Sequence, residues 1–258
     1  MNRAIPHEYH QPRSVLATHI TPAILPTDFH DLYSKIYKVT SLVDWVQIDV
    51  LDGSYAPNKT WPYIGKADGA PDDDIFTKIV KQDEPMPFWD EMNFEVDLLV
   101  KNPAFEADRW IAAGAMRIVV HMDSIELDAF VDLAKRIDAK GVELVVGFSI
   151  DSSVDKLVSY LNAIGDTKDS KIVNCVQCMG IRKIGFQAQP FDTAVLDNIK
   201  KIKEAIPYMF ISVDGGVSEK TAQSLVDAGA DRLIVGSALY TSESIEDTLI
   251  NLSKVFDK

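Results

Sequence analysis

Short apolar runs alternate with amphipathic stretches along most of this chain. Eight runs rich in Val, Ile and Leu are each followed by a stretch in which apolar residues recur every three or four positions. Near-continuous apolar runs are typical of parallel strands covered on both faces, and spacing by three and four is typical of helices. The runs are HITPAIL, WVQIDVL, FEVDLLV, RIVVHM, ELVVGFSI, KIVNCVQCM, MFISVDG and RLIVGSAL.

Eight strand–helix units in about 240 residues predict a (β/α)8 TIM barrel, which is a single α/β domain at residues 18–258. A doubly wound open sheet is the alternative, but no G-x-G-x-x-G motif follows the first expected strand. Residues 1–17 are mixed polar, contain proline and lack the apolar segment of a secretory signal. We therefore expect an N-terminal extension ahead of one barrel domain.

The connection after the second expected strand, residues 54–93, is enlarged. It is acidic and rich in turn-forming residues, and only DDDIFTKIVK has a helical pattern. Long connections in compact domains are usually lids or contact surfaces. An insertion whose aromatic side chains pack locally fits the pattern equally well. Those aromatic residues are Trp61, Tyr63, Phe88 and Trp89.

Composition and charge narrow the classes of partner. The chain is 47% hydrophobic and 25% charged, and its formal net charge is −13. An acidic protein is a poor partner for nucleic acid or an anionic membrane. No run reaches the 18 apolar residues of a membrane-spanning helix, so we expect a cytoplasmic protein. An anionic ligand would need a local pocket of N–H donors, because overall charge would repel it.

Cys175 and Cys178 are the two cysteines of the chain, and they form a C-x-x-C pair. Such a pair is found in redox motifs and in half of a zinc site. Here both residues lie inside the apolar run KIVNCVQCM, which favours buried thiols within a strand.

Polar residues occur where the expected strands end. Gln47 and Asp49 are two positions apart, which places them on the same face of a strand. Asp214 ends the seventh expected strand. Reactive groups in such barrels come from the carboxyl ends of strands, so Asp49 and Asp214 would face each other across the mouth. Two opposed carboxylates suit removal of a proton from one face of a carbon next to a carbonyl and its return on the other. Further polar residues end the third and fourth strands: Glu95, Asp97, His121 and Asp123.

Small residues follow the last two expected strands. A glycine pair comes directly after the seventh strand, and a Gly-Ser pair opens the helix after the eighth. Barrels commonly bind phosphate at these two places, where backbone N–H groups supply the donors. The residues predicted to bind phosphate are Gly215, Gly216, Gly236 and Ser237.

Six fragments, in order over residues 18–256, resemble the ribulose-phosphate 3-epimerase family. They are ITPAILPTDF, WVQIDVLDGSYAPN, FEVDLLVKNP, GFQAQPF, VDGGVS and AGADRLIVGSALY. Family members isomerise a ketopentose 5-phosphate at C3 through an enediolate, with two Asp residues as acid and base and a divalent metal that steadies the oxyanion. The resemblance implies that Asp49 and Asp214 are these two residues. It also implies a flexible substrate loop after strand six, containing Gly185, Phe186, Gln187 and Ala188.

The chain departs from the family pattern where the family binds metal. Gln47 and Asp97 align with two histidines that complete the family's metal site. The implied set of Gln47, Asp49, Asp97 and Asp214 offers only oxygen ligands, which suits Mg²⁺ or Mn²⁺ better than Zn²⁺. With no metal, three carboxylates would converge and at least one pKa should rise markedly. Further family positions are changed at Ala23, Leu51 and Leu99.

Three functional hypotheses follow. We favour a sugar-phosphate epimerase or isomerase resembling ribulose-5-phosphate 3-epimerase, because both carboxylates and the phosphate turns occur together. A related barrel enzyme acting on another phosphorylated substrate is the first alternative. The second is a non-catalytic phosphosugar-binding protein without a metal site. The apolar content of residues 54–93 also suggests that the protein forms a homo-oligomer.

Overall fold

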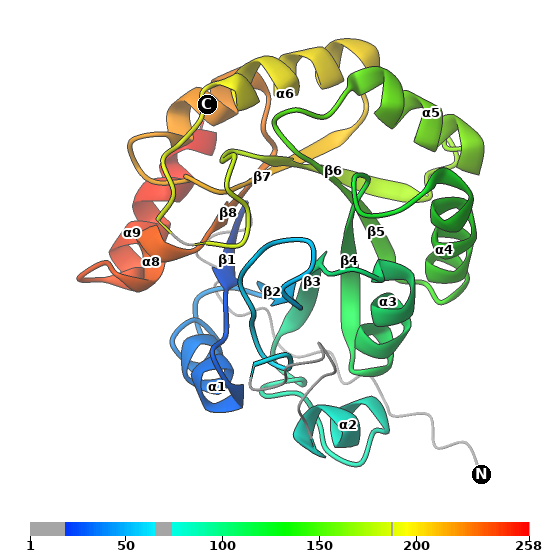
Figure 1. The fold of residues 1–258 in the computed structure, drawn as a ribbon. Helices are drawn as coiled ribbons and strands as arrows, with labels where there is room; N and C mark the ends of the chain where they lie inside the picture. Colours follow the sequence, from blue (N-terminus) through cyan, green and yellow to red (C-terminus); the bar gives the residue numbers. More distant parts are fainter. Residues whose placement is uncertain (1–18, 65–73, 187, 258) are drawn as a thin grey trace.

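Eight parallel strands close into a barrel in the order in which they occur along the chain (Figure 1). The computed structural model describes residues 19–64, 74–186 and 188–257. Each strand coincides with one of the eight apolar runs, so the predicted (β/α)8 barrel is confirmed. The strands are β1 (Ile20–Ile24), β2 (Trp45–Leu51), β3 (Asn93–Leu99), β4 (Ala115–His121), β5 (Glu143–Phe148), β6 (Val173–Met179), β7 (Phe210–Asp214) and β8 (Arg232–Val235).

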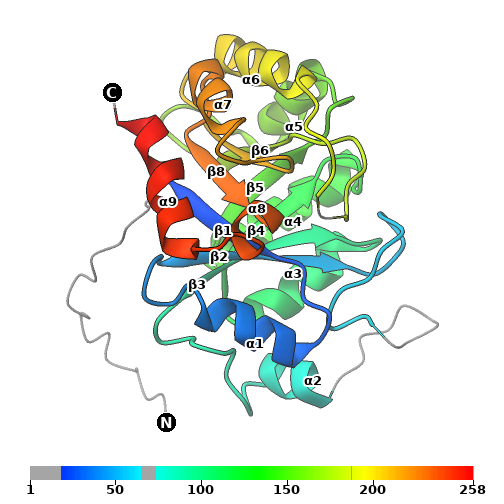
Figure 2. The ribbon, with the colours of Figure 1, turned by 90° about the vertical axis from the view of Figure 1, so that its left-hand side faces the viewer.

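Helices surround the barrel, with α1 and α2 on one side and α6 and α7 on the opposite side (Figure 2). The side chain of Asp28 caps α1 by accepting a hydrogen bond from the N–H of Asp31. In the described ranges, no helix has the length and apolar character needed to cross a membrane. The helices are α1 (Phe29–Tyr37), α2 (Asp74–Val80), α3 (Pro103–Ala112), α4 (Leu127–Ala139), α5 (Val154–Ile164), α6 (Ala194–Ala205), α7 (Ala222–Ala228), α8 (Ser237–Tyr240) and α9 (Ile245–Ser253), followed by a 3₁₀ turn (Lys254–Phe256).

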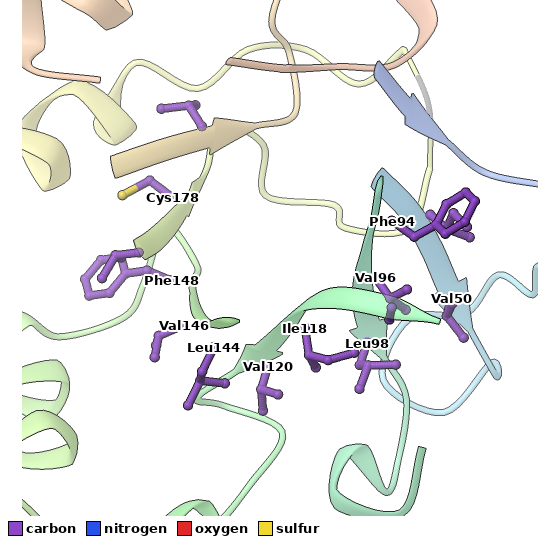
Figure 3. Close-up of a cluster of buried hydrophobic side chains, with 14 of the residues drawn as sticks. Val50, Phe94, Val96, Leu98, Ile118, Val120, Leu144, Val146, Phe148 and Cys178 are labelled. Atoms are coloured by element: carbon purple, nitrogen blue, oxygen red, sulfur yellow. The ribbon is translucent and has the colours of Figure 1, made fainter. Parts of the chain in front are cut away.

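The hydrophobic core lies between the strands and the helices. Outward-facing side chains of the strands, including Val96, Leu98, Ile118 and Val120, are fully buried there (Figure 3). The inner face of the barrel is different, because many of its buried side chains are polar. The apolar character of the strands therefore applies chiefly to the outer face. The buried polar residues on the strands are Thr21, Gln47, Asp49, Glu95, Asp97, Arg117, His121, Gln177, Ser212 and Arg232.

The amino-terminal end of the barrel interior is filled by a group of ion pairs. Oε2 of Glu95, a fully buried residue, accepts hydrogen bonds from Nη1 of Arg117 at 2.9 Å and Nη2 of Arg232 at 2.8 Å. Arg117 also donates to the Glu143 carboxylate at 2.7 Å. Both guanidinium groups are thus paired, and this end of the barrel is electrostatically compensated.

The enlarged connection contributes to the core more than to the barrel mouth. The Trp61 ring lies 5.4 Å from the rings of Phe29 and Phe76 and 5.9 Å from that of Trp110, measured between centroids. Tyr63 is also buried, whereas Trp89 is exposed. Trp61 therefore packs locally, which is one of the two interpretations that the sequence allowed for this connection. Part of the connection, residues 65–73, and the N-terminal extension lie outside the described residues.

The two cysteines are free thiols, and both are buried on β6. Cys175 packs inside the barrel against Val119 and Val145, and Cys178 belongs to the outer core. Because the two side chains lie on opposite faces of one strand, they do not form a common redox or metal site. The expectation of buried strand thiols is confirmed.

Replacing Glu95 by Gln is expected to destabilise the protein by about 3–5 kcal/mol, because the buried Arg232 guanidinium loses its counter-charge and Arg117 keeps only that of Glu143. The free energy of unfolding from urea titration measures this effect. Asp108→Asn is the matched control. Asp108 pairs with Arg136 and Lys140 at the surface, where its side chain is 42% exposed, so a loss of only about 0–1 kcal/mol is expected. Equal losses for the two variants would contradict the role of Glu95.

Candidate active site

Three carboxylates converge at the carboxyl end of the barrel. Asp49 on β2 and Asp97 on β3 are register partners on neighbouring strands, and Asp214 ends β7. Each offers an oxygen within 4.8 Å of the others. The structure therefore brings together Asp49, Asp97 and Asp214, the three carboxylates of the set that the family resemblance implied. These three residues form an acidic cluster.

The Gln47 amide bridges two members of the acidic cluster. Its Nε2 donates to Oδ1 of Asp49 at 2.8 Å and to Oδ2 of Asp214 at 3.2 Å. Gln47 is fully buried, and its Oε1 has no hydrogen-bond partner among the described residues. Gln47 and Asp49, the two polar residues of WVQIDVL, thus belong to one site. The Gln47 amide links Asp49 on β2 to Asp214 on β7.

The third carboxylate is held by His121, one of the polar residues noted at the strand ends, and by Gln177, which the sequence did not single out. Nε2 of His121 lies 2.9 Å from Oδ1 of Asp97, and Nε2 of Gln177 donates to Oδ2 at 3.0 Å. A side chain at Gly147 would place its Cβ 2.5 Å from Nδ1 of His121, so the neighbouring strand must carry glycine there. The alternation of β6 would have identified Gln177, because it lies between the inward-facing Cys175 and Met179.

Burial and like charge raise the pKa values of Asp49 and Asp214. Burial, with Asp214 and Asp97 close by, raises the pKa of Asp49 well above its ordinary value. Burial and the Asp97 carboxylate raise the pKa of Asp214 to about 7. Burial disfavours the charged form of His121, but the adjacent Asp97 carboxylate outweighs it, and the pKa of the imidazole is raised. Asp49 and Asp214 therefore hold their protons to a higher pH than free carboxyl groups do.

The acidic cluster fits a hard divalent cation. Three carboxylates lie close enough to share one ion, and the unpartnered Oε1 of Gln47 is a fourth buried oxygen beside them. Oxygen ligands of this kind are those of Mg²⁺ or Mn²⁺. The side-chain donors that the described residues supply to the cluster are two amides and one imidazole, so a cation would add the missing full charge.

A pocket at the barrel mouth joins the acidic cluster to the glycine turns. Asp49 and Asp214 line it together with the small residues predicted to bind phosphate. The backbone at Gly216 has a φ of +68°, and a Cβ there would lie 2.9 Å from Cα of Phe191. Only glycine therefore allows this turn to pack so closely against the backbone of Phe191. The small residues in the pocket wall are Gly215, Gly216, Gly236 and Ser237.

The loop after β6 covers one side of this pocket. Gly185, Phe186 and Ala188 line the pocket, and Gln187 lies outside the described residues. The carbonyl of Gly185 accepts a hydrogen bond from Nδ2 of Asn58 at 3.0 Å. The loops after β2 and β6 are thus joined over the barrel mouth. Ala23 and Leu99, positions at which the chain departs from the family pattern, also line the pocket.

Relatives with the same fold are known in sequence and in structure. The chain is 26% identical over 235 residues to a ribulose-phosphate 3-epimerase of Eremothecium gossypii, with 89% of each chain covered. It is 25% identical over 239 residues to the cytoplasmic isoform of this enzyme from Oryza sativa, covering 92% of this chain and 94% of that one. The structure of 3-keto-L-gulonate-6-phosphate decarboxylase from Vibrio cholerae superposes with a TM-score of 0.66 at 15% identity, covering 93% of this chain and 98% of that one.

A sequence model of the ribulose-phosphate 3 epimerase family matches residues 19–240, which is most of the barrel. The matched range contains the acidic cluster, the β6 loop and the glycine turns. The chain belongs to the ribulose-phosphate 3 epimerase family.

Proposed function

We propose that this protein epimerises a phosphorylated ketose at the carbon next to the carbonyl, with ribulose 5-phosphate and its C3 epimer as the substrate pair. The observation that carries the proposal is the pairing of Asp49 and Asp214. They come from strands on opposite sides of the barrel, have raised pKa values, and line one pocket with the glycine turns. Family membership gives the substrate class.

Two carboxylates in different protonation states suffice for the chemistry. The ionised member of the pair takes the C3 proton, and the C–H electrons move to the C2 carbonyl to form an enediolate. The protonated member then delivers a proton to the opposite face of C3, and the carbonyl reforms. A raised pKa keeps a carboxylic acid protonated near neutral pH and available as a donor. Asp49 and Asp214 exchange roles when the reaction runs from the other epimer.

A divalent cation, with Mg²⁺ or Mn²⁺ favoured over Zn²⁺, would be held by Gln47, Asp49, Asp97 and Asp214. When bound, it supplies positive charge that stabilises the enediolate oxygen and offsets the charge of the acidic cluster. His121 and Gln177 hold Asp97 in place through their hydrogen bonds.

The rest of the pocket would bind the phosphate and the sugar. Backbone N–H groups of the turns at Gly215–Gly216 and Gly236–Ser237 would hold the phosphate. The β6 loop at Gly185–Phe186, with Gln187 and Ala188, would cover the sugar. Recognition by neutral backbone donors suits a protein with a formal net charge of −13, which cannot attract an anion by its overall field. The named cytoplasmic relative supports a cytoplasmic site of action.

Replacement of either carboxylate by its amide is expected to abolish interconversion of the two epimers. Asp49→Asn and Asp214→Asn should each lower the rate by about 10²–10⁴-fold, since each removes one proton-transfer group. In D₂O, NMR should show deuterium entering C3 in both epimers with the wild-type protein. Each variant should retain exchange from only the epimer whose C3 proton faces the remaining carboxylate. Asp108→Asn, at the surface, is the control and should behave as wild type.

The outcome with wild-type protein separates the three hypotheses. Phosphosugar binding with no exchange into either epimer would leave only the non-catalytic binding protein. Exchange into a different sugar phosphate, with none into ribulose 5-phosphate, would favour a related enzyme. Full activity of the Asp214→Asn variant would contradict the two-carboxylate mechanism.

The stability of the protein without bound cation should fall as pH rises from about 4 to about 7. The pKa of Asp214 is raised to about 7 by folding, so the folded state retains a proton that the unfolded chain has released. This contribution is complete below the unfolded pKa and is lost as pH passes the folded one. Relative to Asp214→Asn, the wild-type free energy of unfolding should decline by about 1.4 kcal/mol per pH unit in this range. Urea unfolding in EDTA measures the free energy of unfolding of both proteins. A difference between them that stays constant from pH 4 to pH 8 would contradict the raised pKa of Asp214.

A further inference from the structure

The Gln47 amide has an unusual set of surroundings. Its NH₂ group donates to Asp49 and Asp214, while its carbonyl oxygen is buried with no hydrogen-bond partner among the described residues. A buried carbonyl without a partner has lost its hydrogen bonds to water with nothing to replace them, which lowers stability. Only the NH₂ end of the Gln47 side chain therefore has hydrogen-bond partners, and this end faces the acidic cluster.

The orientation of the amide follows from the charge around it. With the opposite orientation, Oε1 would face carboxylate oxygens at the 2.8 and 3.2 Å positions that Nε2 occupies. Two acceptors so close repel each other unless a proton or a cation lies between them. The NH₂ end is thus the stable end when the acidic cluster holds no cation.

A cation reverses this preference. The two ends of a side-chain amide have nearly the same shape, so a half-turn of the terminal torsion exchanges a donor for an acceptor with little change in packing. The oxygen that has no partner in the present arrangement would then face the cation, and the carboxylates would lose the amide donor but gain a full positive charge.

We propose that Gln47 is a reversible ligand of the acidic cluster, facing it with NH₂ when no cation is bound and with its carbonyl oxygen when a divalent cation is bound. This inference rests on the cation site of the proposed function. It makes the cation exchangeable, because the Asp49 and Asp214 carboxylates are satisfied by the amide NH₂ when no cation is bound and by the cation when it is bound. Gln177 also has a buried Oε1 with no partner among the described residues, but its Nε2 bridges no two carboxylates: it contacts Asp97 alone, which also has His121 as a partner.

The test compares cation affinity with stability in the absence of cation. Gln47→Leu removes both ends of the amide. It should lower the melting temperature in EDTA and weaken Mn²⁺ binding in calorimetry by about tenfold or more. Gln47→Glu replaces the donor with a fourth carboxylate. It should also lower the melting temperature in EDTA, but it should tighten Mn²⁺ binding by about tenfold or more.

Asp108→Asn is the control, because Asp108 lies at the surface, where it pairs with Arg136 and Lys140 and touches no member of the acidic cluster. It should change Mn²⁺ affinity by less than about threefold. If Gln47→Leu does not fold, the opposite shifts expected of Gln47→Glu still test the proposal. No Mn²⁺ binding by wild type, unchanged Mn²⁺ affinity in Gln47→Leu, or an unchanged melting temperature of Gln47→Glu in EDTA would overturn it.

The two readouts use no substrate, so they are separate from the test of the proposed function. Wild-type protein that binds Mn²⁺ with the expected pattern of variants but exchanges no C3 proton would support the role of Gln47 and refute the epimerase. Deuterium exchange at C3 without Mn²⁺ binding would support the epimerase and refute the role of Gln47.

Discussion

Three carboxylates within 4.8 Å of one another inside a barrel are the constraint around which the carboxyl end of this protein is arranged. Like charges in a buried site repel, and each must be hydrogen-bonded or protonated to remain there. The side chains around them serve this need: Gln47 bridges two carboxylates, and Gln177 and His121 hold the third. Gly147 leaves the space that the imidazole fills.

Buried charges are compensated in different ways at the two ends of the barrel interior. At the amino-terminal end, Glu95 and Glu143 are matched by Arg117 and Arg232, so the charges cancel within the protein. At the carboxyl end the donors are amides and an imidazole, which satisfy hydrogen bonds without cancelling three charges. The uncompensated end is also the one that opens into the pocket with the glycine turns. Electrostatics alone therefore indicates which end can accept a proton, a cation or a substrate.

Strand alternation and turn chemistry made the barrel and much of its mouth predictable from sequence. Apolar runs gave the eight strands, and period two placed Gln47 beside Asp49. The contacts of Asp97 with Gln177 and His121 could not be predicted in the same way, because they depend on the register between different strands and on how side chains meet across the barrel interior. The burial of Trp61 also depended on which helices lie beside a long connection, and its local pattern carries no such information.

Gly147 ties together two positions that are 26 residues apart. A methyl group there would lie 2.5 Å from Nδ1 of His121, and the ring could escape only by leaving the Asp97 carboxylate. Changes at position 147 are thus tolerated only after a smaller residue has replaced the imidazole. Descendants of this chain can lose the histidine and then gain a side chain at 147, but not in the opposite order. Gly147 therefore determines the order in which substitutions at positions 121 and 147 can be accepted.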